Sequence, residues 1–353
     1  MTGPLELRRA FGSENRRRLL TDYFSYFPVD GGVTPENAFQ HIYRLLLWAD
    51  PTTGLAHCYE SDKAQPGRPW YDRSLRFHAW LSQQLGTSPA DLGGEIDWLF
   101  RRAARELARG LTEGRLRLAR EQRAAYDGLG MPEPGEDPEL EEIIREALRP
   151  WFREDPPADI LARLTQRIHE HTRLENKRKN LVGEGFEDVL AGVVGRLHAP
   201  GIESMRARAL LQEIPGFSSP AERAKAKKVD LVLLTRPDSH RVLITAKWSI
   251  RADREEQFGS DFQSYATLER SGQSFDYVLV TNEFDPARLA AACERQVLAR
   301  PLFSEVVHVS TEALLATYGP NLDRSFRRVE QHVASGRLKS LGEWLGRLAK
   351  SST

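Results

Sequence analysis

The sequence predicts an α/β protein whose N-terminal part is mostly helical. Short apolar runs typical of buried strands occur in the second half of the chain, mixed with helical patterns. The first half instead carries apolar residues at helical spacing. A stretch rich in proline and glycine, Asp127–Pro138, separates the two patterns and predicts a linker or long loop. We therefore expect a helical domain over residues 1–130 and a second, α/β domain over residues 131–353.

The helices are predicted from apolar residues that recur on one face. Before the linker, this spacing indicates helices at Glu36–Trp48, Ser74–Leu85 and Asp91–Tyr126. After the linker, it indicates helices at Pro138–Phe152, Ala158–Leu174 and Val182–Leu197.

The strands follow, beginning with a β-hairpin. Val229–Leu234 and Arg241–Ser249 are apolar runs separated by a short turn that contains proline and serine, which is the pattern of two antiparallel strands. Further strands are predicted at Phe275–Thr281 and Val306–Val309, with a helix at Pro286–Leu298 between them. A sheet flanked by helices is the expected architecture of this second domain.

Composition narrows the classes of function. The chain has 353 residues, 40% of them hydrophobic, with 50 basic and 50 acidic side chains. Zero net charge argues against a protein that coats nucleic acid without specificity, but it leaves open an enzyme that gathers its basic residues at one site. The two cysteines have no zinc-ligand spacing. With no signal peptide and no run of about 18 apolar residues, we expect a cytoplasmic protein without a membrane partner.

Two charged residues stand inside the apolar runs of the hairpin. Asp230 lies on the first strand and Lys247 on the second, and the hairpin brings them close to each other. A charge in a buried strand is costly unless it is paired or binds a metal. A carboxylate can hold a hard cation, and a lysine can stabilise a phosphate oxygen or position a water, as phosphodiester hydrolysis requires. This layout resembles the PD-(D/E)xK nuclease fold, although Thr245 stands where that fold commonly has its second acid.

The segment that follows Lys247 carries a closer resemblance. Lys247-Trp-Ser-Ile-Arg-Ala-Asp-Arg254 is similar to the Lys-x-Ser-x-Arg-x-Asp-Arg pattern of the CCGG family of Type II restriction endonucleases. In that family the second metal-binding acid has moved to a helix, to a position that Asp261 occupies here. The resemblance also implies that Arg251 and Arg254 contact guanines and that Asp253 accepts from cytosine amino groups.

A third element of the resemblance lies upstream. Gly183-Glu-Gly-Phe-Glu187 is similar to the Gly-x-x-Phe-Glu element in the first core helix of this nuclease fold, whose glutamate points into the metal site. By that match Glu187 is the ligand, and Glu184, one turn earlier on the same face, is the alternative. Two basic clusters, Lys177–Lys179 and Arg223–Lys228, are candidates for contacts with DNA phosphates.

Taken over residues 176–283, the resemblance implies a Type II restriction endonuclease. It implies Mg²⁺ held by Asp230, Glu187, Asp261 and the carbonyl of Ala246, with Lys247 assisting the attacking water. The substrate would be double-stranded DNA with a palindromic CCGG-type or CCNGG-type core, and a palindrome calls for a homodimer or homotetramer. A cognate DNA methyltransferase acting on the same site would protect the host.

Two alternatives remain open at this stage. Because Thr245 replaces an acid, the chain could be a degenerate nuclease fold that binds DNA without cutting it. It could also be a nuclease of the same fold with a repair or methyl-directed target.

Overall fold

The computed structural model describes most of the chain and divides it into two compact units. The described residues are 9–26, 32–50, 54–56, 66–118, 138–150, 156–219, 226–250, 252–297, 299–319 and 324–350. One unit combines Met1–Arg16 with Phe100–Leu181, and the other combines Arg17–Leu99 with Val182–Thr353. The boundary expected between residues 130 and 131 lies outside the described residues.

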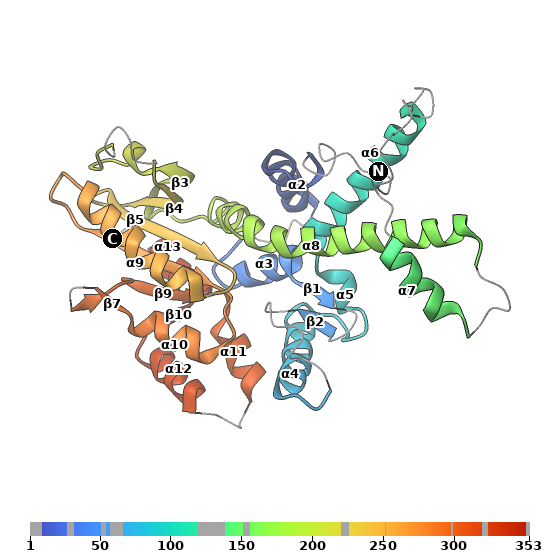
Figure 1. The fold of residues 1–353 in the computed structure, drawn as a ribbon. Coiled ribbons are helices and arrows are strands. Elements are labelled where there is room, and N and C mark those ends of the chain that lie inside the picture. Colours follow the sequence, from blue (N-terminus) through green and yellow to red (C-terminus); the bar gives the residue numbers. More distant parts are fainter. Residues whose placement is uncertain are drawn as a thin grey trace. The chain divides into compact units, whose positions relative to one another are not determined.

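A six-stranded mixed sheet forms the centre of the second unit (Figure 1). Its strand order is β10-β9-β6-β5-β4-β3. The strands are β3 (Ile202–Leu210), β4 (Lys228–Thr235), β5 (His240–Lys247), β6 (Phe275–Thr281), β9 (Glu305–His308) and β10 (Leu338–Ser340). Strands β3, β4 and β5 pair antiparallel, whereas β5, β6, β9 and β10 are parallel neighbours. The expected α/β class, with a mixed central sheet flanked by helices, is confirmed.

The strands predicted from apolar runs are all present. The hairpin of β4 and β5 pairs Leu231 with Ile244 and Thr235 with His240, and β6 has the bounds expected from the sequence. The edge strand β3 was not expected. Its apolar residues are interrupted by Glu203, Arg206 and Arg208, which an edge strand tolerates because it pairs on one side only.

Helices and two small hairpins complete the second unit. The helices are α3 (Ala38–Leu46), α4 (Pro69–Gln84), α5 (Leu92–Glu95), α9 (Ala252–Leu268), α10 (Pro286–Glu294), α11 (Thr311–Tyr318), α12 (Arg324–Ala334) and α13 (Leu341–Lys350). The small hairpins pair β1 (Trp48–Asp50) with β2 (Gly54–Ala56), and β7 (Gln296–Val297) with β8 (Arg300–Pro301). Helix α10 ends before the predicted Leu298 because the chain turns at Arg295 into β7.

The remaining helices include one that is longer than the sequence pattern suggests. They are α2 (Ser13–Tyr26), α6 (Trp98–Leu118), α7 (Pro138–Leu148) and α8 (Ala158–Val194). Helix α8 runs through 37 residues where two separate helices were expected. Its middle stretch, residues 175–181, contains neither proline nor glycine, so nothing in the covalent chain interrupts the helix there. Among the described helices, none is both long and apolar enough to cross a membrane.

Aromatic side chains join the second half of α8 and the helix α9 to the sheet. Phe186 of α8 meets Trp248 edge to face, with ring centroids 5.4 Å apart. Tyr265 of α9 meets Tyr277 of β6 in the same way at 5.6 Å. All four side chains are buried. Because Phe186 precedes Glu187 and Trp248 follows Lys247, the first contact fixes α8 beside the end of β5.

Candidate active site

Asp230 and Lys247 form a close ion pair at the open end of the β4–β5 hairpin. The Lys247 Nζ atom lies 2.6 Å from Asp230 Oδ2 and donates a hydrogen bond to it. Both side chains are mostly buried, with 15% of Lys247 and 20% of Asp230 exposed. The hairpin register accounts for this meeting, since both residues lie beyond Leu231 and Ile244, the last pair between β4 and β5.

The same carboxylate oxygen receives two further hydrogen bonds from β5. The backbone N–H of Ala246 donates to Asp230 Oδ2 at 2.9 Å, and the Thr245 hydroxyl donates at 3.3 Å. Thr245 therefore occupies the position where the nuclease pattern commonly has an acid, and it supports the one carboxylate that remains there. These donors fix the orientation of the Asp230 carboxylate.

Glu187 joins this pair from α8. Its Oε1 atom lies 3.7 Å from Lys247 Nζ, and 19% of its side chain is exposed. The aromatic contact of Phe186 with Trp248 places Glu187 beside the end of β5. Glu184, the alternative considered from the sequence, is exposed, and its backbone carbonyl contacts Arg208.

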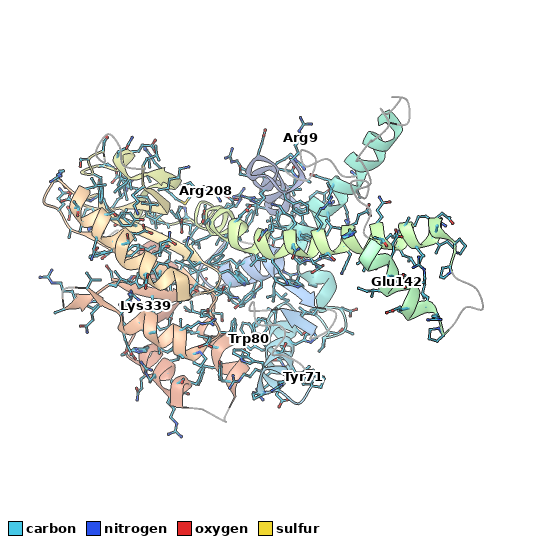
Figure 2. All side chains as sticks on the ribbon, viewed as in Figure 1. Arg9, Tyr71, Trp80, Glu142, Arg208 and Lys339 are labelled. Atoms are coloured by element: carbon cyan, nitrogen blue, oxygen red, sulfur yellow. The ribbon has the colours of Figure 1, made fainter. Side chains whose placement is uncertain are left out.

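Arg208 of β3, which is labelled in Figure 2, holds this part of α8 through three contacts. Its Nε donates to Glu187 Oε2 at 3.0 Å, one terminal nitrogen donates to the Asp188 carboxylate, and the other donates to the Glu184 carbonyl at 3.1 Å. The backbone of Arg208 has φ of 51°, a left-handed conformation that is uncommon for a residue with a side chain. Strained residues of this kind cluster at functional sites.

Electrostatics leave this cluster with an excess of negative charge. Asp230, Glu187 and Asp188 are carboxylates, and the cations Lys247 and Arg208 lie against them. Burial raises the pKa of Glu187, and the neighbouring Asp230 raises it further, while Lys247 and Arg208 act in the opposite direction. A carboxyl whose pKa is raised by a second carboxylate is a frequent mark of a functional site.

Asp261 takes part in a separate ion pair. Its Oδ1 atom lies 2.8 Å from Lys227 Nζ, just before β4. Its negative charge, like that of Asp230, raises the pKa of the buried Tyr265 hydroxyl, although burial itself has the larger effect. The structure thus brings Asp230, Lys247 and Glu187 together, and it pairs Asp261 with Lys227.

The donor set of the cluster is of the kind that Mg²⁺ prefers. In the part of the chain that the structure describes, no three His, Cys, Asp or Glu side chains gather closely enough to hold an ion by themselves. Mg²⁺ in nucleotide and nucleic-acid enzymes is commonly held by one or two carboxylates, with waters and phosphate oxygens completing the shell. Asp230 and Glu187, which both flank Lys247, can supply those two carboxylates.

Two of the three predicted readout residues belong to helix α9. Arg251 lies outside the described residues. Asp253 and Arg254 lie in the first turn of α9, and their side chains are outside the described part. Ile250, the residue before Arg251, is buried, and its backbone N–H donates to Glu283 at 2.7 Å.

Sequence patterns did not indicate three of the side chains that organise this region: Arg208, Asp188 and Glu283. Arg208 contacts Glu187 and Asp188, and Glu283 contacts Ile250, through tertiary packing. Lys227, from the basic cluster expected to contact DNA phosphates, pairs with Asp261. A comparison with models of protein families finds no match for this chain, and a comparison with curated protein sequences finds none either.

Proposed function

We propose that this protein is a Mg²⁺-dependent Type II restriction endonuclease with a PD-(D/E)xK core. One observation carries the proposal: Asp230, Lys247 and Glu187 converge from three separate elements into one mostly buried, negatively charged cluster. An ordinary surface ion pair needs neither the third group nor the burial. The order α8-β3-β4-β5-α9-β6, a helix followed by an antiparallel meander and a crossover helix, also supports this core.

The chemistry proposed for the cluster is hydrolysis of a phosphodiester bond. A Mg²⁺ ion held here would supply positive charge to the phosphate and would lower the pKa of a water molecule. Asp230 and Glu187 would hold the ion, with the Ala246 carbonyl and Asp261 as further candidate ligands. Lys247, held by Asp230, would donate a hydrogen bond to a phosphate oxygen or orient the attacking water. Arg208 would keep the Glu187 carboxylate turned toward Lys247.

We propose that residues at the start of α9 recognise the bases of the DNA target. Arg251 and Arg254 would contact guanine O6 and N7, and Asp253 would accept from cytosine amino groups. We propose a palindromic CCGG-type or CCNGG-type core in double-stranded DNA as the target. A palindrome is matched by a two-fold dimer, so we propose a homodimer or homotetramer, together with a cognate methyltransferase that modifies the same site. The proposed location is the cytoplasm.

A panel of short duplexes tests this proposal. The duplexes carry CCGG, CCNGG with each central base, the cytosine-methylated forms of both, and GGCC as a control of matched composition. The purified protein is incubated with each duplex in Mg²⁺ and in EDTA, and the products are resolved on denaturing gels. We expect cleavage in Mg²⁺ of an unmethylated CCGG-type or CCNGG-type duplex only. Cleavage restricted to methylated duplexes would instead favour a methyl-directed nuclease.

A second candidate function follows from Thr245. A hydroxyl at this position leaves the end of β5 with one carboxylate fewer than the common nuclease pattern, so the fold could bind DNA without cutting it. That function predicts sequence-specific binding, no cleavage in Mg²⁺, and binding that is unaffected by Lys247→Ala.

A further inference from the structure

The start of α9 is held in place by a buried carboxylate from a different part of the chain. Glu283 lies in the β6–α10 turn, residues 282–285, and only 1% of its surface is exposed. Its Oε2 atom accepts from the N–H of Ile250 at 2.7 Å, and its Oε1 atom accepts from the N–H of Asp285 at 2.8 Å. Each oxygen of one carboxylate therefore receives a backbone donor.

Because Glu283 is buried, both of its carboxylate oxygens need hydrogen-bond donors. Removing a carboxylate from water is costly unless hydrogen bonds compensate, so a buried glutamate with two backbone donors requires both of its oxygens. A neutral amide of the same shape has one oxygen, and its NH₂ group would face the second N–H. The side chain is thus matched in both shape and charge to the two backbone groups that it joins.

The β6–α10 turn is itself firmly anchored. The Tyr43 hydroxyl donates to Asn282 Oδ1 at 2.9 Å, and the Tyr318 hydroxyl donates to the Phe284 carbonyl at 2.7 Å. The Glu283 carbonyl contacts His308 Nε2 at 3.0 Å. These three contacts lie on consecutive residues of the turn, and all the side chains that make them are buried. Glu283 therefore contacts Ile250 from a turn whose residues are hydrogen-bonded to buried side chains of other elements.

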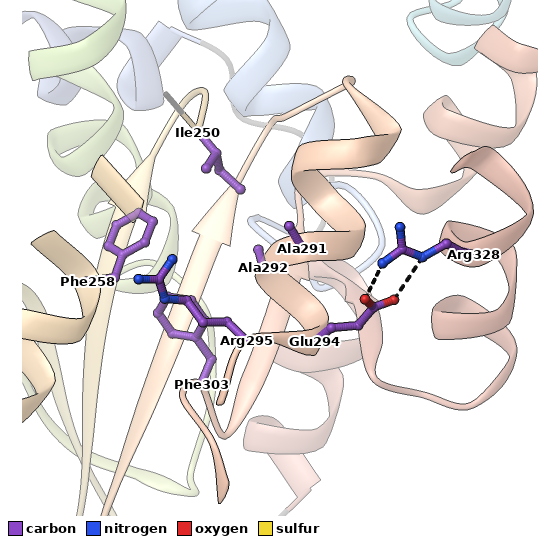
Figure 3. Close-up of a pocket in the computed structure, with 8 residues that line it drawn as sticks. All are labelled: Ile250, Phe258, Ala291, Ala292, Glu294, Arg295, Phe303 and Arg328. Carbon is purple, nitrogen blue, oxygen red and sulfur yellow. Dashed lines mark hydrogen bonds and ion pairs between the residues drawn. The ribbon is translucent and has the colours of Figure 1, made fainter. Parts of the chain in front are cut away.

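The loop that enters α9 is bonded to the same turn at a second point. The N–H of Asn282 donates to the Trp248 carbonyl at 3.0 Å, so the turn and the loop are bonded at both ends of the 248–250 segment. The Ile250 side chain is 1% exposed and lines a cavity of about 250 Å³ together with Phe258 and Phe303 (Figure 3). The backbone of the 248–250 segment is thus bonded to the β6–α10 turn at two points, immediately before Arg251.

We propose that Glu283 is a positioning residue for sequence recognition: it fixes the backbone at Ile250, two residues before α9 begins. The inference rests on the proposed function, because it requires that residues 251–254 read bases. Bidentate contacts between a guanidinium and a guanine depend on placement within a few tenths of an ångström to about 0.5 Å. A shift at Ile250 therefore weakens discrimination between sequences more than it weakens attraction to the DNA backbone.

The test compares Glu283→Gln with the wild-type protein, using full-length chains. Fluorescence anisotropy in EDTA measures the dissociation constants for the CCGG and CCNGG duplexes and for the GGCC control. The specificity ratio is the dissociation constant for GGCC divided by that for the best cognate duplex. We expect the ratio to fall about tenfold or more, as loss of one bidentate base contact does, with the GGCC affinity unchanged.

Two further variants make the result decisive. Asp285→Ala removes the side-chain cap of α10 from the same turn but keeps both backbone donors of Glu283, so it controls for lost stability and should keep the wild-type ratio. Glu283→Asp shortens the carboxylate; it should lower the ratio too, and it takes the place of Glu283→Gln if that variant does not fold. A wild-type ratio in the folded Glu283 variant would overturn the inference alone. A wild-type protein that binds all duplexes equally would overturn the proposed function, and this inference with it.

Discussion

Strand β5 has a mostly buried cation near each end, Arg241 and Lys247, and the two cations have different partners. At the start of the strand, Arg241 is 2% exposed and donates to Glu269, to the Ser271 hydroxyl and to the carbonyls of Pro215 and Gln273. At the other end, Lys247 lies between Asp230 and Glu187.

The pKa values of the glutamates at the two ends, Glu269 and Glu187, are shifted in opposite directions. Hydrogen bonds from Ser271 and Arg241 lower the pKa of Glu269 to about 2. Burial and the nearby Asp230 raise the pKa of Glu187. The contacts between Arg241, Glu269 and Ser271 stabilise the fold. The cluster at Lys247 retains unfavourable negative charge that a bound cation would relieve, which is a property of functional sites.

The largest effect is expected when the cation at the functional end is removed. Lys247→Ala should lower the cleavage rate by about a hundredfold to a thousandfold or more, because it removes a donor from the reacting phosphate or water. Single-turnover cleavage and anisotropy together check that binding of the cognate duplex is kept. Lys339→Ala is the matched control, since Lys339 pairs with Glu305 away from the cluster and should cut at the wild-type rate. Cleavage by Lys247→Ala at the wild-type rate would remove Lys247 from the site.

Removal of the cation at the structural end should act on stability instead. Arg241→Ala should lower the free energy of unfolding by about 3 kcal/mol, because it removes a buried guanidinium that pairs with Glu269 and binds the Pro215 and Gln273 carbonyls. Urea unfolding measures this loss. The control is Arg347→Ala, because the Arg347 side chain is 54% exposed where it pairs with Glu305, and its loss should change stability by less than about 1 kcal/mol. If Arg241→Ala were as stable as Arg347→Ala, the two ends of β5 would not differ as argued.

A third substitution separates recognition of the DNA sequence from cleavage. Arg254→Ala should weaken binding of the cognate duplex by about 1–3 kcal/mol, the usual cost of one bidentate base contact. Anisotropy with the cognate and GGCC duplexes measures it, and affinity for GGCC should be nearly unchanged. Cleavage with unchanged specificity would show that this arginine does not read the site.

The smallest expected effects are on stability, and they have opposite signs for Glu187→Gln and Glu269→Gln. A raised pKa means that the folded state disfavours the charged form, so Glu187 costs stability as the pH rises through its folded pKa. In EDTA at neutral pH, Glu187→Gln should therefore raise the melting temperature, and the difference should vanish below about pH 4.

Glu269→Gln should do the reverse. Its lowered pKa contributes stability that is present above the ordinary glutamate pKa and is lost as the pH falls toward 2. Melting curves of both variants over this pH range check the signs. A fall in melting temperature for both variants at neutral pH would contradict the contrast between the two ends.

The sequence predicts local elements well and tertiary partners poorly. Strands β4, β5, β6 and β9 were predicted because their apolar runs are continuous, and the hairpin alone brings Asp230 to Lys247. Strand β3 was missed because charged residues break its pattern. Arg208 lies on that strand, so its grip on α8 could not be anticipated.

Other contacts depend on how distant segments pack. Lys227 meets Asp261 across 34 positions of sequence, and Glu283 meets Ile250 across 33. No local periodicity encodes such pairs, since each depends on the placement of α9 against the sheet. The long helix α8 has a similar cause: composition permits it, but nothing in the apolar spacing requires that two helical segments join.

The central claim is that the cluster of Asp230, Lys247 and Glu187 cuts DNA at specific sites. The most direct measurement is digestion of unmethylated phage-sized DNA by the wild-type protein and by Lys247→Ala, in Mg²⁺ and in EDTA, followed by sequencing of every cut end. The account predicts discrete ends at CCGG-type or CCNGG-type sites with wild type in Mg²⁺, and none in EDTA or with Lys247→Ala. Intact DNA with the wild-type protein in Mg²⁺, or ends that Lys247→Ala also produces, would contradict it.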